Sequence, residues 1–360
     1  MSHNILITGG SGYLGGSLLA GLPAANLPPY QTLYALVRSD SQAEAVKKHY
    51  NATPITIDLS SPDSITSAIT SNKITIVFHL YNTMDTDGPQ HFIRALASVQ
   101  KATGLQTHFL FTTGAKLFSS HAGAPTDTAL PDASPESYTI QKNLSTTSPN
   151  PLMQQAALAN TLVIDEATSL GVHAYVFAPC MVYGKSRGAF GNPISIQTTA
   201  IVKAAKALRK VYSFEDGNPT WPVCYIDDNT SLYVELLRAM IEGREVPNGK
   251  QGFYLASSGS VAWSDFYAKV AKELKGKGAV DTEEVVRWDG KDWEVLKGMW
   301  SAWGYPGDAS VEMCSFIVGG ECTMTSVNGK TIGWTPKYAP EHILETTNEE
   351  VALILENAKN

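Results

Sequence analysis

The first half of the chain alternates short apolar runs with longer segments whose apolar residues recur at helical spacing. The apolar runs predict buried strands, because strands covered on both faces are almost continuously hydrophobic. We predict strands over residues 4–8, 31–37, 53–57, 74–80 and 107–113, and helices over residues 12–21, 41–49, 62–71 and 89–103. This alternation predicts a parallel sheet with helices on both faces, whose ligands bind beyond the carboxyl ends of the strands.

A glycine-rich turn joins the first predicted strand to the first predicted helix. Residues 8–15 read T-G-G-S-G-Y-L-G. Glycines at positions 9, 12 and 15 allow a tight turn, close approach of backbone N–H groups to a pyrophosphate, and close packing of the helix on the strand. A phosphate bound there lies at the positive end of the helix. The pattern therefore predicts a dinucleotide-binding turn.

This turn resembles the T-G-x-x-G-x-x-G fingerprint of the extended short-chain dehydrogenase/reductase family, which also contains nucleotide-sugar epimerases and dehydratases. Residues 178–184, A-P-C-M-V-Y-G, resemble the family's R-P-x-x-V-Y-G, and residues 332–337, I-G-W-T-P-K, resemble its closing G-W-x-P. The resemblance extends from about residue 4 to about residue 356. It implies an α/β fold: a Rossmann doubly wound parallel sheet with a smaller mixed α/β C-terminal substrate lobe.

The resemblance also implies a division of the chain into two domains. We expect residues 1–185, with returning segments near 211–255, to form the cofactor-binding Rossmann domain. Residues 186–210 and 256–345 are expected to form the substrate-binding lobe, and residues 346–360 a C-terminal helix. A chain of 360 residues is long enough for a Rossmann core with a second lobe.

The same resemblance identifies the residues expected to contact a nicotinamide cofactor. They are Thr8, Gly9, Gly12, Tyr13, Leu14, Gly15, Asp58, Leu59, Leu80, Tyr81, Asn82, Thr112, Pro179 and Met181. Asp58 would meet the adenine amine, although capping of the turn that follows it explains an aspartate there nearly as well. Tyr81 replaces a small residue of the family, and its bulk would instead narrow the substrate pocket.

The end of the second predicted strand favours NADP(H) over NAD(H). An acidic residue at this position would bind the adenosine ribose, whereas this chain has Arg38. Arginine offers a planar, permanently charged partner for a 2′-phosphate. The alternative is a solvated surface arginine.

The catalytic residues of the family are a Ser or Thr after strand five and a Tyr-x-x-x-Lys pair, which puts both side chains on one helix face. Here Thr113 lies one residue before the expected hydroxyl position, which Gly114 occupies. The motif matches at Tyr138 and Lys142. Either Tyr138 is the catalytic acid and an insertion follows Lys142, or the match is a coincidence and the tyrosine is absent. Pro149 and Pro151 would break any helix continuing from Lys142.

A further candidate is Lys116. Residues 113–116, T-G-A-K, resemble the T-G-x-K of the progesterone 5β-reductase and iridoid synthase branch. That branch reduces activated C=C bonds with NADPH and draws its lysine from this loop. Carried over, Lys116 would lie near the nicotinamide ribose and the substrate carbonyl. The alternative is a solvated loop lysine.

Composition excludes several other classes of protein. A net charge of −7 argues against a nucleic-acid-binding surface, and no apolar run approaches the ~18 residues that span a membrane. The four cysteines form no C-x-x-C pair and the histidines show no ligand spacing, so we expect no metal and reduced thiols. We expect a cytoplasmic protein without a secretory signal, and a homodimer through the helices near 89–103 and 152–170 by analogy.

These features together predict an NADPH-dependent oxidoreductase that reduces a carbonyl or an activated C=C bond. Four of the seven tryptophans lie between residues 288 and 303, where they would cap an apolar or aromatic substrate or pack the small lobe. Two alternatives stay open. One is a redox-neutral epimerase, dehydratase or isomerase that retains its cofactor. The other is a catalytically degraded NADP(H)-binding regulator.

Overall fold

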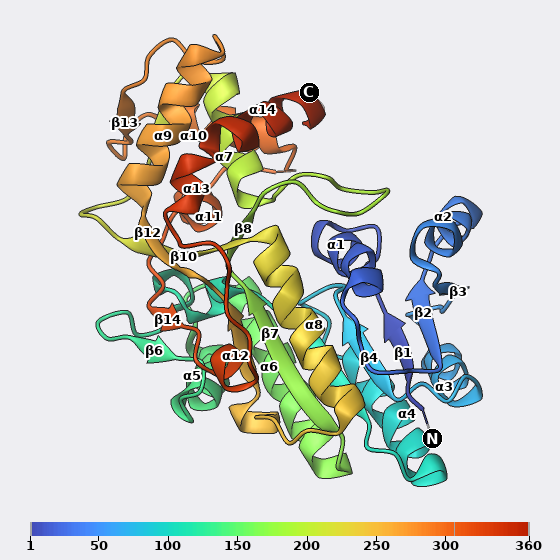
Figure 1. Ribbon diagram of the computed structural model, residues 1–360. Coiled ribbons are helices and arrows are strands. Elements are labelled where there is room, and N and C mark those ends of the chain that lie inside the picture. Colours follow the sequence, from blue (N-terminus) through green and yellow to red (C-terminus); the bar gives the residue numbers. More distant parts are fainter. Residues whose placement is uncertain (1, 306, 359–360) are drawn as a thin grey trace.

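The computed structural model describes residues 2–305 and 307–358, and its centre is a seven-stranded parallel sheet (Figure 1). The strand order is β11-β7-β5-β4-β1-β2-β3, which reverses direction at β1 as in a doubly wound fold. The predicted Rossmann sheet is thereby confirmed. The strands are β1 Asn4–Ile7, β2 Thr32–Leu36, β3 Thr53–Ile55, β4 Ile76–His79, β5 His108–Thr112, β7 His173–Pro179 and β11 Phe253–Ala256.

Two helical layers cover the sheet, each held by its own apolar core. Apolar side chains of α1, α2 and α8 share one buried cluster with the sheet, and those of α3, α4 and α6 share another. The helices are α1 Tyr13–Gly21, α2 Asp40–Tyr50, α3 Pro62–Ser71, α4 Gly88–Thr103, α6 Pro151–Leu170 and α8 Ile226–Glu242. Because both faces are covered, the strands are nearly all apolar, which is why the sequence pattern locates them.

A separate helix, α5 (Glu136–Thr147), precedes α6 and packs against it. The predicted break between them is present. Asn150 caps α6 by accepting a 2.9 Å hydrogen bond from the Leu152 N–H, and Pro151 occupies the first turn, where a missing N–H costs nothing.

The small lobe is built mainly from the C-terminal third of the chain, at the top of Figure 1. One three-stranded sheet joins β8, β10 and β12, and β9 pairs with β13. The lobe's strands are β8 Met181–Tyr183, β9 Val211–Ser213, β10 Thr220–Tyr225, β12 Gly259–Ala262 and β13 Val285–Arg287. Its helices are α7 Gln197–Leu208, α9 Trp263–Gly276, α10 Trp293–Trp303, α11 Val311–Val318, α13 His342–Glu345 and α14 Thr347–Asn357.

The expected return of residues 211–255 to the Rossmann domain needs a correction. In that range α8 and β11 do join the main sheet and its layers, but β9 and β10 pair with strands of the small lobe. The lobe also sends segments back. The short β14 (Met324–Thr325) pairs with β6 (Leu130–Pro131), and α12 (Asn328–Thr331) lies against β11.

The segment 185–193, which we call the strap, connects β8 to α7 and lies across α1 (Figure 1). The Asn192 N–H donates to the Ser11 carbonyl over 3.1 Å. The Ser17 and Ser186 hydroxyls are 2.9 Å apart. The strap therefore ties the small lobe to the glycine-rich turn.

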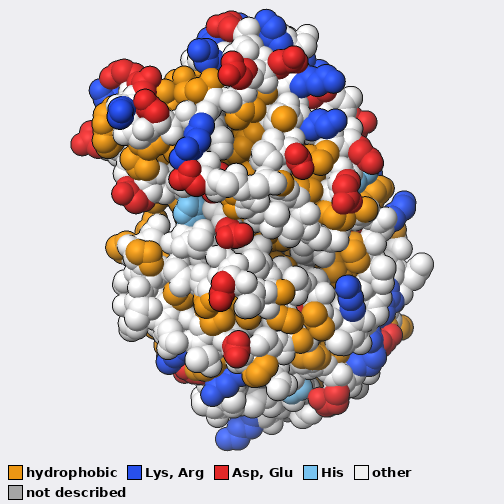
Figure 2. Space-filling model, turned by 90° about the vertical axis from the view of Figure 1, so that its left-hand side faces the viewer, with side chains coloured by type: hydrophobic (Ala, Val, Ile, Leu, Met, Phe, Trp, Pro, Cys, Tyr) orange, Lys and Arg blue, Asp and Glu red, His pale blue; other side chains and the backbone are white. Residues whose placement is uncertain are grey.

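Charged side chains of both signs are mixed over the small lobe in the view of Figure 2, without a large patch of one sign. Within the described ranges, no helix is long and apolar enough to cross a membrane. Among the described residues, no group of three or more His, Cys, Asp or Glu side chains is placed to hold a metal ion. All four cysteines are free thiols.

Candidate cofactor and substrate site

The glycine-rich turn between β1 and α1 has the geometry that close approach of a phosphate requires. Gly9 has a φ of +71°, and a Cβ at Gly15 would lie 2.3 Å from the Gly9 carbonyl oxygen. A side chain at either position would displace backbone. Gly12 caps α1 without a side chain, so the first N–H groups of the helix are left to an anion. The turn thus fits the pyrophosphate of a dinucleotide.

The end of β4 supports this turn from the neighbouring strand. The Leu80 N–H donates to the Thr8 hydroxyl over 2.9 Å, and a Cβ at Gly9 would lie 2.8 Å from the Leu80 carbonyl oxygen. Tyr81 is 44% exposed, and Asn82 has a φ of +49°. Tyr81 does not line the cavity described below. The structure therefore gives no support to the expectation that its bulk narrows the substrate pocket.

Arg38 lies at the carboxyl end of β2, immediately before the N-cap of α2. Its side chain is exposed, and its N–H donates to Gln42 Oε1 over 2.9 Å. Ser39 caps α2, so Arg38 directly precedes a helix N-terminus at the carboxyl edge of the sheet. This is the predicted place for a 2′-phosphate.

Asp58 makes the turn-capping contacts that were the alternative to adenine binding. Its Oδ1 accepts hydrogen bonds from the Ser60 N–H over 3.0 Å and from the Ser60 hydroxyl over 2.7 Å. These bonds lower the pKa of Asp58. The neighbouring Leu59 is partly buried against the core under α3 and α4. Adenine contact by either residue stays a prediction.

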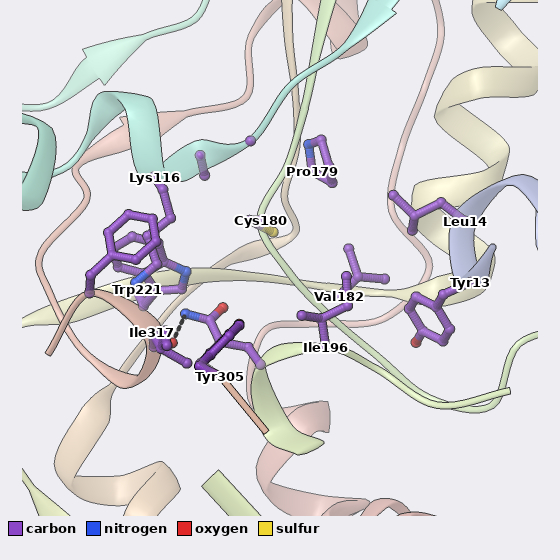
Figure 3. Close-up of a pocket in the computed structure, with 14 residues that line it drawn as sticks. Tyr13, Leu14, Lys116, Pro179, Cys180, Val182, Ile196, Trp221, Tyr305 and Ile317 are labelled. Carbon is purple, nitrogen blue, oxygen red and sulfur yellow. Dashed lines mark hydrogen bonds between the residues drawn. The ribbon is translucent and has the colours of Figure 1, made fainter. Parts of the chain in front are cut away.

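A cavity of about 290 Å³ begins at α1 and extends beneath the small lobe (Figure 3). Most of its wall is apolar, and among the described residues that line it Lys116 is the one charged side chain. The lining residues are Tyr13, Leu14, Gly114, Ala115, Lys116, Pro179, Cys180, Val182, Ile196, Gln197, Trp221, Tyr305, Phe316 and Ile317. The cavity therefore connects the first turn of the dinucleotide-binding helix to an enclosed amine.

Lys116 belongs to the 3₁₀ turn Ala115–Phe118 that follows β5, and the solvated-loop alternative is wrong. Its Nζ donates to the Gly319 carbonyl over 2.7 Å and lies 4.2 Å from the centre of the Trp221 ring. Burial disfavours the charged form and lowers the pKa of Lys116 to about 7, while the carboxylate of Glu215 opposes this shift. An amine with this pKa changes its protonation state near neutral pH.

The other residues predicted around the end of β5 and β7 are distributed between the cavity and the core. The Thr112 hydroxyl is 2.8 Å from the Tyr233 hydroxyl. Thr113 is buried, and its Oγ1 has no hydrogen-bond partner in the described ranges. Pro179 lines the cavity, whereas Met181 is in the core of the lobe.

Tyr138 and Lys142 do not reach the cavity. They lie on α5, where the Tyr138 hydroxyl donates to Asp165 Oδ1 over 2.6 Å and Lys142 Nζ donates to Asp165 Oδ2 over 3.0 Å. Burial and this carboxylate raise the pKa of Tyr138 to about 12. A catalytic tyrosine needs the opposite shift. The prediction that this pair serves the catalytic site is therefore corrected: the pair braces α5 against α6.

Sequence reasoning missed several lining residues of the small lobe. Trp221 comes from β10, Ile196 and Gln197 from the start of α7, and Phe316 and Ile317 from α11. The tryptophans between 288 and 303 do not line the cavity. Trp288 packs on Phe214 with ring centres 5.4 Å apart, and Trp303 Nε1 donates to the Ala200 carbonyl over 2.8 Å. The short apolar run of β10 was the one available signal for Trp221.

A parallel doubly wound sheet with a glycine-rich turn at its first strand defines a dinucleotide-binding protein of the Rossmann class. A family model narrows this class. The NAD dependent epimerase/dehydratase family matches residues 5–248. The chain therefore belongs to that family, as the sequence motifs predicted. No curated protein sequence matches this chain.

Solved structures of several enzymes share the fold over nearly the whole chain. UDP-glucose 4-epimerase from Thermotoga maritima is 16% identical with a TM-score of 0.61, covering 98% of this chain and 99% of its own. Vestitone reductase from alfalfa is 16% identical with a TM-score of 0.60 (99% and 98%). The dTDP-glucose 4,6-dehydratase from Bacillus anthracis, solved with NAD, is 12% identical with a TM-score of 0.60 (99% and 97%). Epimerase, reductase and dehydratase thus share this architecture.

Proposed function

We propose that this protein is an NADPH-dependent oxidoreductase that reduces a carbonyl or an activated C=C bond of an apolar small molecule. The observation that carries the proposal is the cavity that joins the glycine-rich turn to Lys116 through apolar walls. When bound, the cofactor supplies the hydride. The chain's own residues hold its phosphates at the turn and the 2′-phosphate at Arg38, and they enclose the substrate.

Lys116 supports the proposal that the substrate is reduced. Because its pKa is about 7, its ammonium form is present at neutral pH and acidic enough to donate a proton to a substrate oxygen that gains negative charge. In this proposal Lys116 takes the place of the tyrosine of the family, since Tyr138 is engaged with Asp165.

The redox-neutral alternative on a nucleotide sugar has less support from the cavity. A sugar nucleotide carries a diphosphate, whose recognition favours arginine or several cationic groups. Lys116 is the one cation among the described lining residues. If the protein binds NADP(H) but reduces no substrate, the alternative of a catalytically degraded regulator is favoured.

The proposal also covers the compartment, the partners and the oligomeric state of the enzyme. We propose a cytoplasmic protein with a small-molecule substrate and no nucleic-acid partner, forming a homodimer through α4 and α6. Leu158 on α6 is 37% exposed, which suits an interface. Light scattering on the wild type and on Leu158→Glu tests the dimer: a monomeric wild type would rule it out.

The first experiment titrates the wild type and Arg38→Ala with NADPH and with NADH, followed by tryptophan fluorescence. We expect the wild type to prefer NADPH and Arg38→Ala to lose most of that preference, because the 2′-phosphate loses its cationic partner. Arg287→Ala is the control, since the exposed Arg287 pairs with Asp216 on the small lobe. Equal affinity for both nucleotides in the wild type would contradict the cofactor assignment.

A screen of ketones, aldehydes and enones then follows the loss of the NADPH absorbance band. We expect substrate-dependent NADPH consumption that Lys116→Met abolishes and Tyr138→Phe leaves intact. Turnover without NADPH consumption would favour the redox-neutral alternative.

A further inference from the structure

A buried tryptophan N–H without an acceptor lies at the wall of the cavity. Trp221 on β10 is 1% exposed, and its Nε1 has no hydrogen-bond partner in the described ranges. Its neighbour Trp263, with ring centres 5.9 Å apart, donates its own N–H to the Gly320 carbonyl over 2.6 Å. A buried donor left unpaired is unfavourable. Of these two adjacent indoles, the one that lines the cavity is therefore the one that lacks an acceptor.

A second donor lies over the face of the same indole. Lys116 Nζ is 4.2 Å from the centre of the Trp221 ring, and Figure 3 shows the two side chains together at one end of the cavity. An ammonium group has three N–H donors, and the hydrogen bond recorded for Lys116 is the one to the Gly319 carbonyl. Lys116 therefore has donor capacity left for a ligand.

The rest of the cavity sets the shape of what these donors receive. Phe316 and Ile317 supply apolar surface near them. Ile196, Val182 and Leu14 continue it toward α1. Gln197 is the one side-chain amide among the described lining residues, and it donates to the Ile317 carbonyl over 3.3 Å. The end of the cavity near Lys116 thus offers donors to a ligand oxygen and apolar surface to the ligand body.

We propose that the indole N–H of Trp221 and the Nζ of Lys116 together bind one acceptor oxygen of the substrate. Both groups donate and neither accepts when Lys116 is protonated, so a carbonyl oxygen with two lone pairs satisfies them best. The substrate class is a compact apolar ketone or enone with its oxygen at one end. This inference rests on the proposed function, which identifies the oxygen as the carbonyl to be reduced. Trp221 is a binding and positioning residue.

The indole N–H signals of protein labelled with ¹⁵N-tryptophan test this directly. Trp221→Phe assigns the Trp221 signal by its disappearance, and survival of the remaining indole signals shows that the variant folds. The probes are 1-indanone and 2-cyclohexen-1-one, with indane as the oxygen-free match for the first. We expect both ketones to move the Trp221 signal downfield, as a new hydrogen bond requires, and indane not to do so. The Trp263 signal is the internal control.

Binding affinities provide the second measurement. We expect the wild type to bind 1-indanone about tenfold more tightly than indane, equivalent to about 1.4 kcal/mol, and Trp221→Phe to lose most of this preference. A Trp221 signal that stays in place with both ketones up to their solubility limits would overturn the inference. An equal response to indane and 1-indanone would overturn it too.

The outcome is separable from that of the proposed function because the spectra need no turnover. A Trp221 response to ketones without any NADPH consumption would retain the oxygen site and reject the reductase. NADPH-dependent reduction with unchanged kcat/KM in Trp221→Phe, and no Trp221 response, would retain the reductase and reject the oxygen site.

Discussion

Single residues set the chemistry of this site, and glycine at position 15 is the clearest case. A Cβ there would lie 2.3 Å from the carbonyl oxygen of Gly9, a distance that forces the turn apart. Trp221 and Lys116 are the opposite case. Their roles depend on which partners the fold leaves them, and residue type alone does not reveal those partners.

We predict that Gly15→Ala weakens NADPH binding by at least tenfold, because the turn must shift to relieve the clash. Tryptophan fluorescence titration measures the change. Gly276→Ala at the end of α9 is the control, since a Cβ there meets nothing within 4 Å. Unchanged affinity in Gly15→Ala would show that the turn does not hold the cofactor.

The pH dependence of turnover tests Lys116. Its pKa is lowered to about 7, so the protonated form that donates to substrate is present below pH 7 and is lost as pH rises through this value. We predict that kcat/KM falls about tenfold per unit above pH 7. The nearby His121, whose burial lowers its pKa to about 4, is already neutral in this range. Arginine stays charged over this range. If Lys116→Arg gives the same pH profile as the wild type, the assignment of the profile to Lys116 is wrong.

At the scale of elements, the strap at 185–193 connects two parts of the site. It reaches from β8 of the small lobe across α1, and the Ala189 N–H donates to the Tyr50 hydroxyl at the end of α2 over 2.7 Å. Gly191 allows the closest approach. Its φ is +91°, and a Cβ there would lie 2.0 Å from the Ser11 carbonyl oxygen.

We therefore predict that Gly191→Ala lowers NADPH affinity several-fold by pushing the strap off the glycine-rich turn. Gly217→Ala is a matched control: Gly217 also has a positive φ of +72°, but a Cβ there meets nothing within 4 Å. Comparable backbone strain without the clash should leave NADPH affinity intact. Equal losses in the two variants would mean that strain alone is responsible.

The whole molecule depends on contacts between segments far apart in the chain. Asp132 is fully buried and accepts hydrogen bonds from the N–H groups of Leu255, Val327 and Asn328 over 2.7–2.8 Å. It thereby joins the start of α12 to β11 and to the segment before α5.

We predict that Asp132→Ala lowers the free energy of unfolding by about 3 kcal/mol or more, because three buried backbone donors lose their acceptor. Urea unfolding followed by circular dichroism measures it. Asp127→Ala, at an exposed position of the same segment, should change stability by less than about 0.5 kcal/mol. A similar small effect for both variants would show that the hydrogen bonds to Asp132 do not stabilise the fold.

The sequence by itself determined the sheet, its helices and the glycine-rich turn. These features depend on local periodicity and on glycine's backbone freedom, both of which can be read over short stretches. The order of strands and helices, the break before Pro151 and the family followed from the same local signals. Lys116 was identified from the resemblance of the T-G-A-K segment at residues 113–116 to a known motif, which is also a local signal.

Tertiary structure alone decided which side chains meet. Tyr138 and Lys142 have the spacing of a catalytic pair, but α5 packs on α6 and gives both to Asp165. Trp221, Phe316 and Ile317 reach the cavity from β10 and α11, more than 100 residues after Lys116 in the chain. No local pattern records such contacts, because they arise only when the small lobe closes over the carboxyl edge of the sheet.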